Sequence, residues 1–126
     1  MSVLGATARM KRSEALSLWH RVTLETVIAN GPDLSTRQLA ILMSVYLESS
    51  SHTVKSLSSK LNVTKAVISR ALDTLSKHGF VARAPDPSDK RSIIVTRTSG
   101  GILYLQRFAD IIQTEIKLDD LDRAAA

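Results

Sequence analysis

Apolar residues recur at helical spacing along most of the chain. The clearest stripe lies in residues 65–78, where a period of about 3.6 connects Val67, Ile68, Ala71, Leu72 and Leu75. The same spacing predicts helices over residues 14–30, 35–48, 54–61 and 102–118. The chain is therefore expected to be mainly helical.

Polar residues that commonly begin or end helices stand at the edges of these stretches. Ser35 and Gln38 have the spacing of a capping box, in which each side chain bonds the backbone N–H of the other residue. Gly79 follows Lys77 and His78, and it suits the left-handed position that closes a helix. Four further hydroxyl side chains are each expected to cap a helix: Ser13, Thr53, Thr64 and Thr98.

Two β-prone runs lie between the helix that ends near His78 and the last helix. They are FVARA (80–84) and SIIVTR (92–97), and the segment between them contains Pro85 and Pro87. This pattern predicts a β-hairpin with a stiff turn. A short helix, a tight turn and a longer helix form a helix-turn-helix, and a hairpin directly after it makes a winged helix. We therefore expect an α+β fold, mainly α with a small β-hairpin wing, in which a winged helix-turn-helix is flanked by N- and C-terminal helices.

The net charge of +5 comes from the middle of the chain. Residues 1–52 hold five Lys or Arg against four Asp or Glu, residues 53–97 hold nine against three, and residues 98–126 hold three against five. The three segments therefore carry charges of +1, +6 and −2. A confined basic segment is the usual electrostatic mark of a protein that binds a polyanion. The alternative is that the charge serves only solubility.

Composition argues against several kinds of chemistry. The chain has no cysteine, and its three histidines lie far apart in the sequence, so we expect no disulfide, no thiol chemistry and no metal site. No Gly-rich phosphate loop or nucleophile motif indicates an enzyme or a bound cofactor. No apolar run approaches the roughly 18 residues that cross a bilayer, and no secretion signal precedes the first helix. The expectation is a cytoplasmic protein without a membrane partner.

The residues off the apolar stripe of 65–78 are candidates for contact with DNA, because the second helix of a helix-turn-helix lies in the major groove. They are Thr64, Lys65, Ala66, Ser69, Arg70 and Thr74. Arg70 is the best candidate for a bidentate contact to guanine, and Thr64 is the best candidate for a contact to phosphate. Asp73 would be repelled by a close phosphate, so it is expected either to face sideways or to pair with Arg70 or Lys77 at helical spacing.

Residues 61–101, LNVTKAVISRALDTLSKHGFVARAPDPSDKRSIIVTRTSGG, resemble the core of the multiple-antibiotic-resistance regulator (MarR) family. The family pattern runs from a polar helix through L-x-x-x-G-[LF]-[VI]-x-R to D-P-x-D-[RK]-R and then T-x-x-G. The matching residues are Leu75, Gly79, Phe80, Val81, Arg83, Asp86, Pro87, Asp89, Lys90, Arg91, Thr98 and Gly101. The resemblance implies a homodimeric transcription factor, usually a repressor, that binds a palindromic operator in double-stranded DNA.

The resemblance also implies roles for residues of the hairpin. Lys90 or Arg91 would enter the minor groove, and Asp89 would hold that cation in place. Arg83 and Ser88 complete the set of residues expected to contact DNA. Ordinary turn chemistry is the alternative for the aspartates of the hairpin tip.

The expected organisation has five parts: a flexible arm (1–12), an N-terminal dimerisation helix (13–31), the winged helix-turn-helix (32–98), a C-terminal dimerisation helix (99–118) and a frayed tail (119–126). The dimer is expected to use Leu18, Trp19, Val22, Tyr104, Ile111 and Leu118. Family members usually have two helices after the hairpin, whereas this chain has room for one. That difference argues against the family's usual pocket for a small-molecule effector. The alternative to a DNA-binding regulator is a winged-helix module that contacts other proteins and no DNA.

Overall fold

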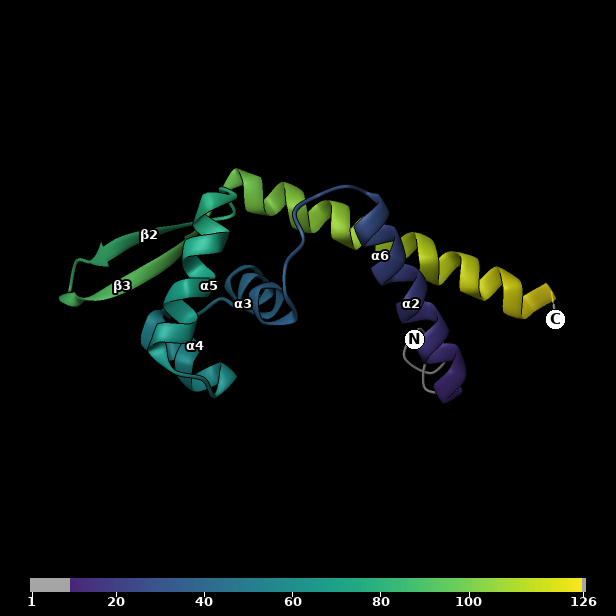
Figure 1. Ribbon diagram of the computed structural model, residues 1–126, viewed down its shortest axis with the longest axis horizontal. Helices are drawn as coiled ribbons and strands as arrows, with labels where there is room; N and C mark the ends of the chain where they lie inside the picture. Colours follow the sequence, from purple (N-terminus) through teal and green to yellow (C-terminus); the bar gives the residue numbers. More distant parts are fainter. Residues whose placement is uncertain (1–9, 126) are drawn as a thin grey trace. The chain divides into compact units, whose positions relative to one another are not determined.

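The computed structural model describes residues 10–125 and confirms the expected fold class (Figure 1). The chain is mainly helical and carries a three-stranded antiparallel sheet. Its described residues divide into a central unit, Pro32–Gln106, and a terminal unit formed by residues 10–31 and 107–125. The predicted arm falls mostly on residues 1–9, which lie outside the described residues.

The helices of the central unit begin and end where their capping residues predict. They are α3 (Thr36–Leu47), α4 (Val54–Leu61) and α5 (Lys65–Lys77). Ser35 and Gln38 form the reciprocal capping box, with bonds of 2.9 and 3.1 Å. Thr53 and Thr64 each accept a bond from a backbone N–H of the following turn. Gly79 closes α5 at a φ of 74°, in the left-handed region that favours glycine.

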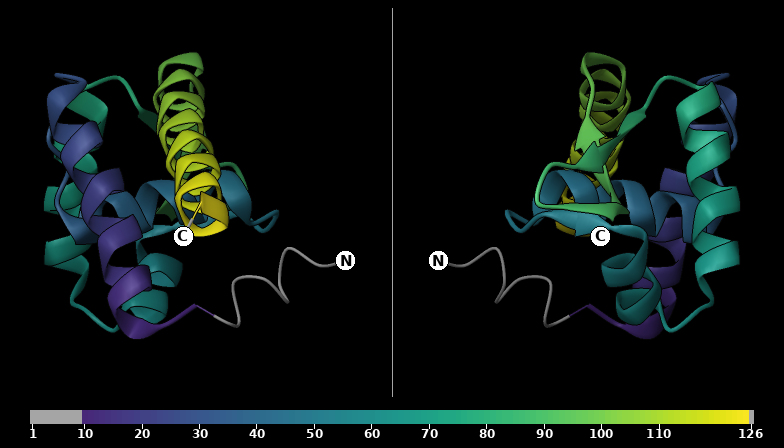
Figure 2. Two further views of the ribbon diagram at one scale, coloured as in Figure 1. Left: turned by 90° about the vertical axis from the view of Figure 1, so that its right-hand side faces the viewer. Right: turned by 90° about the vertical axis from the view of Figure 1, so that its left-hand side faces the viewer.

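The sheet has the order β1-β3-β2, with β1 (His52–Thr53), β2 (Val81–Asp86) and β3 (Asp89–Arg97). The long hairpin of β2 and β3 can be followed in Figures 1 and 2. The sequence did not predict β1, which pairs through His52 with Val95 and through Thr53 with Ile94. A strand of two residues has no pattern of its own, and only the partner strand reveals it.

The hairpin strands are longer than the sequence predicted. We expected a proline-rich turn over 85–91, but β2 runs through Pro85 to Asp86 and β3 begins at Asp89. Proline is tolerated here because β2 is an edge strand, whose outward-facing positions need no N–H donor. The turn is thereby reduced to Pro87 and Ser88. A register shift between Pro85 and Asp86 leaves residues 90–92 of β3 without partners in β2.

The core of the central unit buries the predicted stripe of α5. Ile68, Leu72 and Leu75 are 0% exposed, and they pack with the apolar faces of α3 and α4 and with the bases of β2 and β3. The other buried members of this cluster are Ile41, Leu42, Val45, Leu57, Ala71, Phe80, Val81 and Val95. Helix α5 is therefore packed against the core along one face, which leaves its opposite face to solvent.

The ends of α5, β3 and α3 meet at one point, which we call the Tyr46 junction (Tyr46, Gly79, Phe80, Thr98 and Gly101). The Tyr46 hydroxyl accepts the Thr98 N–H at 2.8 Å and lies 2.8 Å from the Phe80 carbonyl oxygen. The Thr98 hydroxyl donates to the Gly79 carbonyl at 2.7 Å and accepts the Gly101 N–H at 3.0 Å, as its predicted role as a helix cap requires. These bonds fix where the last helix begins.

The terminal unit contains α2 (Arg12–Ile28) and the second part of α6 (Ser99–Ala125). Ser13 does not cap α2, because the helix already begins at Arg12, where the backbone N–H of Lys11 donates to the Glu14 carboxylate at 3.1 Å. Arg12 of the predicted arm is therefore helical.

Helix α6 continues well beyond its predicted end at Leu118. The polar segment 119–126, expected to be frayed, is helical through Ala125. Two of its charged residues pair with α2: Asp119 with Arg21, and Arg123 with Glu14. These ion pairs with a helix far away in the sequence explain why hydrophobic spacing alone ended the helix too early.

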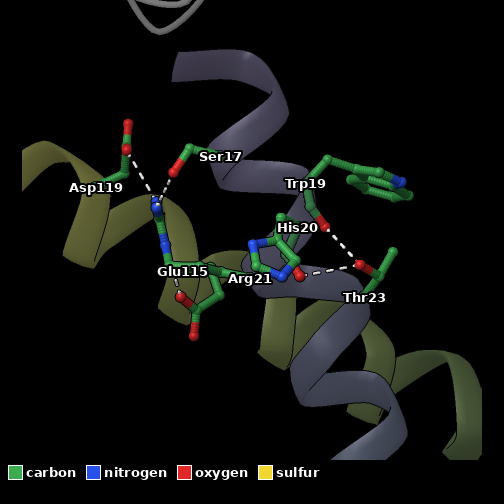
Figure 3. A network of polar contacts seen from close by, with 7 residues as sticks. All are labelled: Ser17, Trp19, His20, Arg21, Thr23, Glu115 and Asp119. Carbon is green, nitrogen blue, oxygen red and sulfur yellow. Dashed lines mark hydrogen bonds and ion pairs between the residues drawn. The ribbon is translucent and has the colours of Figure 1, made fainter. Parts of the chain in front are cut away.

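Arg21 is the centre of this ion-pair network (Figure 3). Its Nε donates to Glu115 at 3.2 Å and its Nη2 donates to Asp119 at 2.9 Å, while its Nη1 donates to the Ser17 hydroxyl at 3.0 Å. Both carboxylate residues are 7% exposed. One guanidinium therefore bridges two buried carboxylates, and Arg123, with its Nη1 3.7 Å from an Asp119 oxygen, brings a second positive charge.

Arg21→Met is expected to lower the free energy of unfolding by about 2 kcal/mol, because it leaves two buried carboxylates without their main partner. This value lies below the usual cost of breaking a buried pair, since the Arg21 side chain is 31% exposed. Urea unfolding followed by circular dichroism measures the difference. The matched control is Lys117→Met on the exposed face of α6, which should change stability by less than about 0.5 kcal/mol. Equal losses in the two variants would contradict the assignment.

Candidate nucleic-acid interface

The outer face of α5 carries most of the residues that the sequence singled out. Thr64, Lys65, Ala66 and Arg70 are exposed, whereas Ser69 and Thr74 are half-buried. The Thr64 hydroxyl accepts the Val67 N–H at 3.3 Å, and its own proton remains available to an acceptor outside the helix. The structure therefore gathers these six side chains on and beside one exposed helix face.

The turn between α4 and α5 sets the direction of that face. Asn62 takes the left-handed conformation with a φ of 56°, which an Asn side chain tolerates better than most. The Val63 N–H donates to the Ser58 carbonyl, and the Ser58 hydroxyl donates to the Val63 carbonyl. These bonds across the turn tie the start of α5 to α4, and burial of the α5 stripe then fixes the rotation of the helix about its axis.

Asp73 and Arg83 connect α5 to the hairpin. The Arg83 Nη1 lies 2.8 Å from an Asp73 carboxylate oxygen, with the two side chains 33% and 63% exposed. This pairing corrects the expectation that Asp73 pairs with Arg70 or Lys77. Helical spacing offered those two partners, but the left-handed turn at Gly79 folds β2 back along α5 and brings Arg83 closer. Arg83, expected to contact DNA, is engaged by a carboxylate of its own chain.

The hairpin tip is ordered by its two aspartates. Asp86 accepts the Ser88 N–H at 2.9 Å and the Ser88 hydroxyl at 2.8 Å, and these bonds hold the pKa of the Asp86 carboxyl below its ordinary value. Asp89 accepts the backbone N–H of Arg91 at 3.1 Å, so the bond that the structure shows orients the Arg91 backbone rather than its guanidinium. Ser88 and Asp89 thus shape the turn.

The hairpin tip also carries two cationic side chains. Lys90 and Arg91 are exposed, and neither forms an ion pair within residues 10–125. Two positive charges therefore stand unneutralised by the described chain at the end of a paired hairpin. Such a tip can contact a polyanion without first breaking an internal salt bridge.

A cleft beside α5 was not anticipated from the sequence. It has a volume of about 210 Å³ and lies between the first turn of α3 and the middle of α5. Its lining residues are Ser35, Arg37, Gln38, Val67, Arg70, Ala71 and Thr74. The sequence pointed to Arg70 and Thr74 but not to Arg37, which is 33 residues away from Arg70 along the chain. The only sequence feature that could have singled out Arg37 is its position just after the helix cap Ser35.

The residues expected to form a dimer differ in how exposed they are. Val22 is 1% exposed, whereas Tyr104 is half-buried and its ring packs on Phe80 with the centroids 4.6 Å apart. Val22 is buried within its own chain, unlike the surface position expected of a dimer contact. Partial burial raises the pKa of the Tyr104 hydroxyl. Leu18 and Ile111 are half-buried.

Other apolar side chains of the terminal unit are exposed. Trp19 is 51% exposed, and its ring points away from the Arg21 network in Figure 3, while Leu118 is 47% exposed. The sequence missed other exposed members of this group: Leu16, Leu24, Val27, Ile28 and Leu121.

Within residues 10–125, every helix is too short or too polar to pass through a lipid bilayer. In the same residues, no three His, Asp or Glu side chains are arranged so that they could hold a metal ion.

Comparison with known proteins finds similarity to the MarR family. The model of the MarR family matches residues 34–93. The HTH-type transcriptional repressor YetL of Bacillus subtilis is 36% identical over 80 residues, which are 62% of this chain and 47% of YetL. The multiple antibiotic resistance protein MarR of Escherichia coli is 29% identical over 84 residues, which are 67% of this chain and 58% of that protein. The chain thus aligns with about half the length of these curated relatives.

Solved structures show the same fold at lower sequence identity. The transcriptional regulator Tm0710 from Thermotoga maritima superposes with a TM-score of 0.74 at 21% identity, over 94% of this chain and 80% of that one. A point mutant of S. aureus MepR, bound to an oligodeoxyribonucleotide, superposes with a TM-score of 0.74 at 18% identity, over 85% of this chain and 76% of that one.

Proposed function

We propose that this chain, which belongs to the MarR family, is a DNA-binding transcriptional regulator. More specifically, we propose that it is a repressor that binds a palindromic operator as a homodimer. The observation that carries the proposal is the pairing of an exposed polar helix face with an unneutralised cationic hairpin tip in one compact unit. A relative of known repressor function and a DNA-bound structure of the same fold support it.

Helix α5 is proposed to lie in the major groove. The N-terminal residues of such a helix come nearest to the base edges, which here are Lys65, Ala66 and Ser69. A lysine can donate to guanine, a serine can donate or accept, and the Ala66 methyl can contact a thymine methyl. The Thr64 hydroxyl, which keeps its proton free, would donate to a backbone phosphate. Sequence is thus read from the first turns of α5.

The hairpin is proposed to reach the flanking minor groove. Lys90 and Arg91 supply positive charge at the tip, where a narrow minor groove has its most negative potential. Arg83 has a different role in this proposal: its ion pair with Asp73 holds β2 against α5 and so fixes the angle between hairpin and helix. Ser88 and Asp89 maintain the turn that presents the two cations.

The second copy is proposed to cover the exposed apolar side chains of the terminal unit. Trp19, Leu118 and the exposed aliphatic residues of α2 and α6 leave an apolar surface that water would otherwise solvate. A two-fold dimer uses the same patch on both copies. It also presents two α5 helices, which would bind half-sites about one helical turn of DNA apart.

Selection of bound sites from a random DNA pool tests the proposal. The expected result is an inverted repeat with its half-sites about one helical turn, roughly 10 base pairs, apart. Light scattering after size exclusion should give twice the mass of the 13.8 kDa chain. If no duplex is retained even at low salt, the chain is not a DNA-binding regulator, and the winged-helix protein-interaction module becomes the better explanation.

Lys65→Ala is expected to relax the preference at one base pair of each selected half-site by about 1 kcal/mol, because one donor to a base edge is lost. Anisotropy titrations with duplexes changed at single positions measure this preference. The matched control is Lys60→Ala: the Lys60 ammonium pairs with Glu48 at 2.7 Å and should leave every base preference unchanged. A uniform loss at all positions would instead make Lys65 a phosphate contact.

A further inference from the structure

The cleft between α3 and α5 brings together two positive charges and no negative one. Arg37 enters it from the first turn of α3 and Arg70 from the middle of α5. The remaining lining residues are polar or apolar but uncharged, and none is a carboxylate. A concave surface with this lining repels cations and attracts anions.

Neither arginine is neutralised by the described part of its own chain. Within residues 10–125, Arg37 and Arg70 take part in no ion pair, whereas Arg21, Arg83 and Arg123 each do. The nearest helical carboxylate to Arg70 is Asp73, and it is already engaged by Arg83. Two like charges that share a cleft repel each other, and a bound anion removes this cost.

The neutral polar groups of the cleft can add donors. The Ser35 hydroxyl accepts the Gln38 N–H and keeps its own proton for another acceptor. The Thr74 hydroxyl lies 3.4 Å from the Arg70 carbonyl oxygen, a long and weak bond that an incoming acceptor could replace. Guanidinium groups match the geometry of phosphate oxygens with two parallel donors each.

We propose that this cleft binds a single backbone phosphate of the DNA, and that Arg37 and Arg70 both contact that phosphate. The inference rests on the proposed function, since it adds a contact beside the helix that would occupy the major groove. The phosphates of the groove's edge flank such a helix, and contacts to them fix the protein's register on the duplex. Arg70 therefore positions the helix and does not read guanine, which departs from its expected role.

The experiment is a salt titration of binding to duplex DNA, followed by fluorescence anisotropy with the full chain. Arg37→Ala and Arg70→Ala should each reduce the slope of log affinity against log salt by about 0.9 and weaken binding about tenfold near 0.1 M salt. Arg70→Ala should leave the ranking of different duplexes unchanged. Arg37→Lys keeps the charge and should keep the slope. Arg107→Ala is the matched control and should bind like the wild type, because Arg107 is an exposed arginine of α6 with no ion pair among residues 10–125.

The outcomes separate this inference from the proposed function. If the wild type binds no duplex at low salt, both are overturned. If the wild type binds but Arg37→Ala keeps the wild-type slope, only the phosphate cleft is overturned. A change in base preference in Arg70→Ala at unchanged slope would likewise overturn it and return Arg70 to base reading. Both arginines are exposed, and an unchanged melting curve for each variant confirms that binding and not folding has changed.

Discussion

Replacing Lys90 and Arg91 together by alanine is expected to weaken binding to every duplex, by about 50-fold near 0.1 M salt. Each positive charge lost from contact with the DNA should lower the slope of log affinity against log salt by about 0.9, so the slope of the double variant should fall by about 1.8. The physical reason is the release of counterions from DNA, which depends on charge at the contact surface and not on base sequence. Lys90 and Arg91 are exposed at the end of a paired hairpin, so no ion pair within the described residues is lost with them.

The charge of the whole protein must be separated from charge at this tip. The double variant Arg107→Ala and Lys117→Ala removes the same two charges from the exposed surface of α6 and is the matched control. It should shift affinity by no more than about threefold, since neither side chain belongs to the proposed contact surface and salt weakens the effect of charges that make no contact. Equal losses in the two double variants would mean that the hairpin makes no contact of its own.

Gly101→Ala is expected to destabilise the fold by about 3 kcal/mol, because the new methyl group has no room. A Cβ at this position would overlap the Tyr46 hydroxyl and the Phe80 carbonyl oxygen. Helix propensity alone would favour alanine by about 1 kcal/mol, but the overlap involves backbone and also breaks the bonds of the Tyr46 hydroxyl. The overlap should therefore decide the sign, and the melting temperature should fall by about 10 °C.

Three further variants test this explanation by thermal melting. Ser99→Ala changes an exposed residue in the same helical turn and should be nearly neutral. Gly100→Ala would place its Cβ 2.8 Å from the Gly79 carbonyl oxygen and should cost less than Gly101→Ala. Adding Tyr46→Phe to Gly101→Ala removes the overlap with the hydroxyl oxygen, although the ring carbon Cζ stays 2.6 Å from the new Cβ. The double variant should therefore lose less than the sum of its single losses. A stabilised Gly101→Ala would show that propensity dominates at this junction.

Local interactions made much of the fold predictable. The capping box of Ser35 and Gln38, the Thr64 cap and the glycine at position 79 all act within a few residues, so they can be read along the chain. The apolar stripe of α5 likewise predicted the buried face correctly, because a helix repeats its faces at a fixed period. The exposed polar face of α5 could be predicted for the same reason, because it lies opposite the buried stripe. The exposed hairpin tip could be predicted because it follows the turn residues between two β-prone runs.

The sequence by itself thus determined the helices, the hairpin and the location of the basic segment. Only the tertiary structure decided which distant residues meet: β1 with β3, Asp73 with Arg83, Arg37 with Arg70, and Arg21 with the far end of α6. Each of these contacts depends on the path of the chain between its members, and no short-range rule of spacing contains that path. Burial of α5 and the turn at Gly79 set the path in the central unit, and with it the charges that face outward and those that are neutralised within the chain.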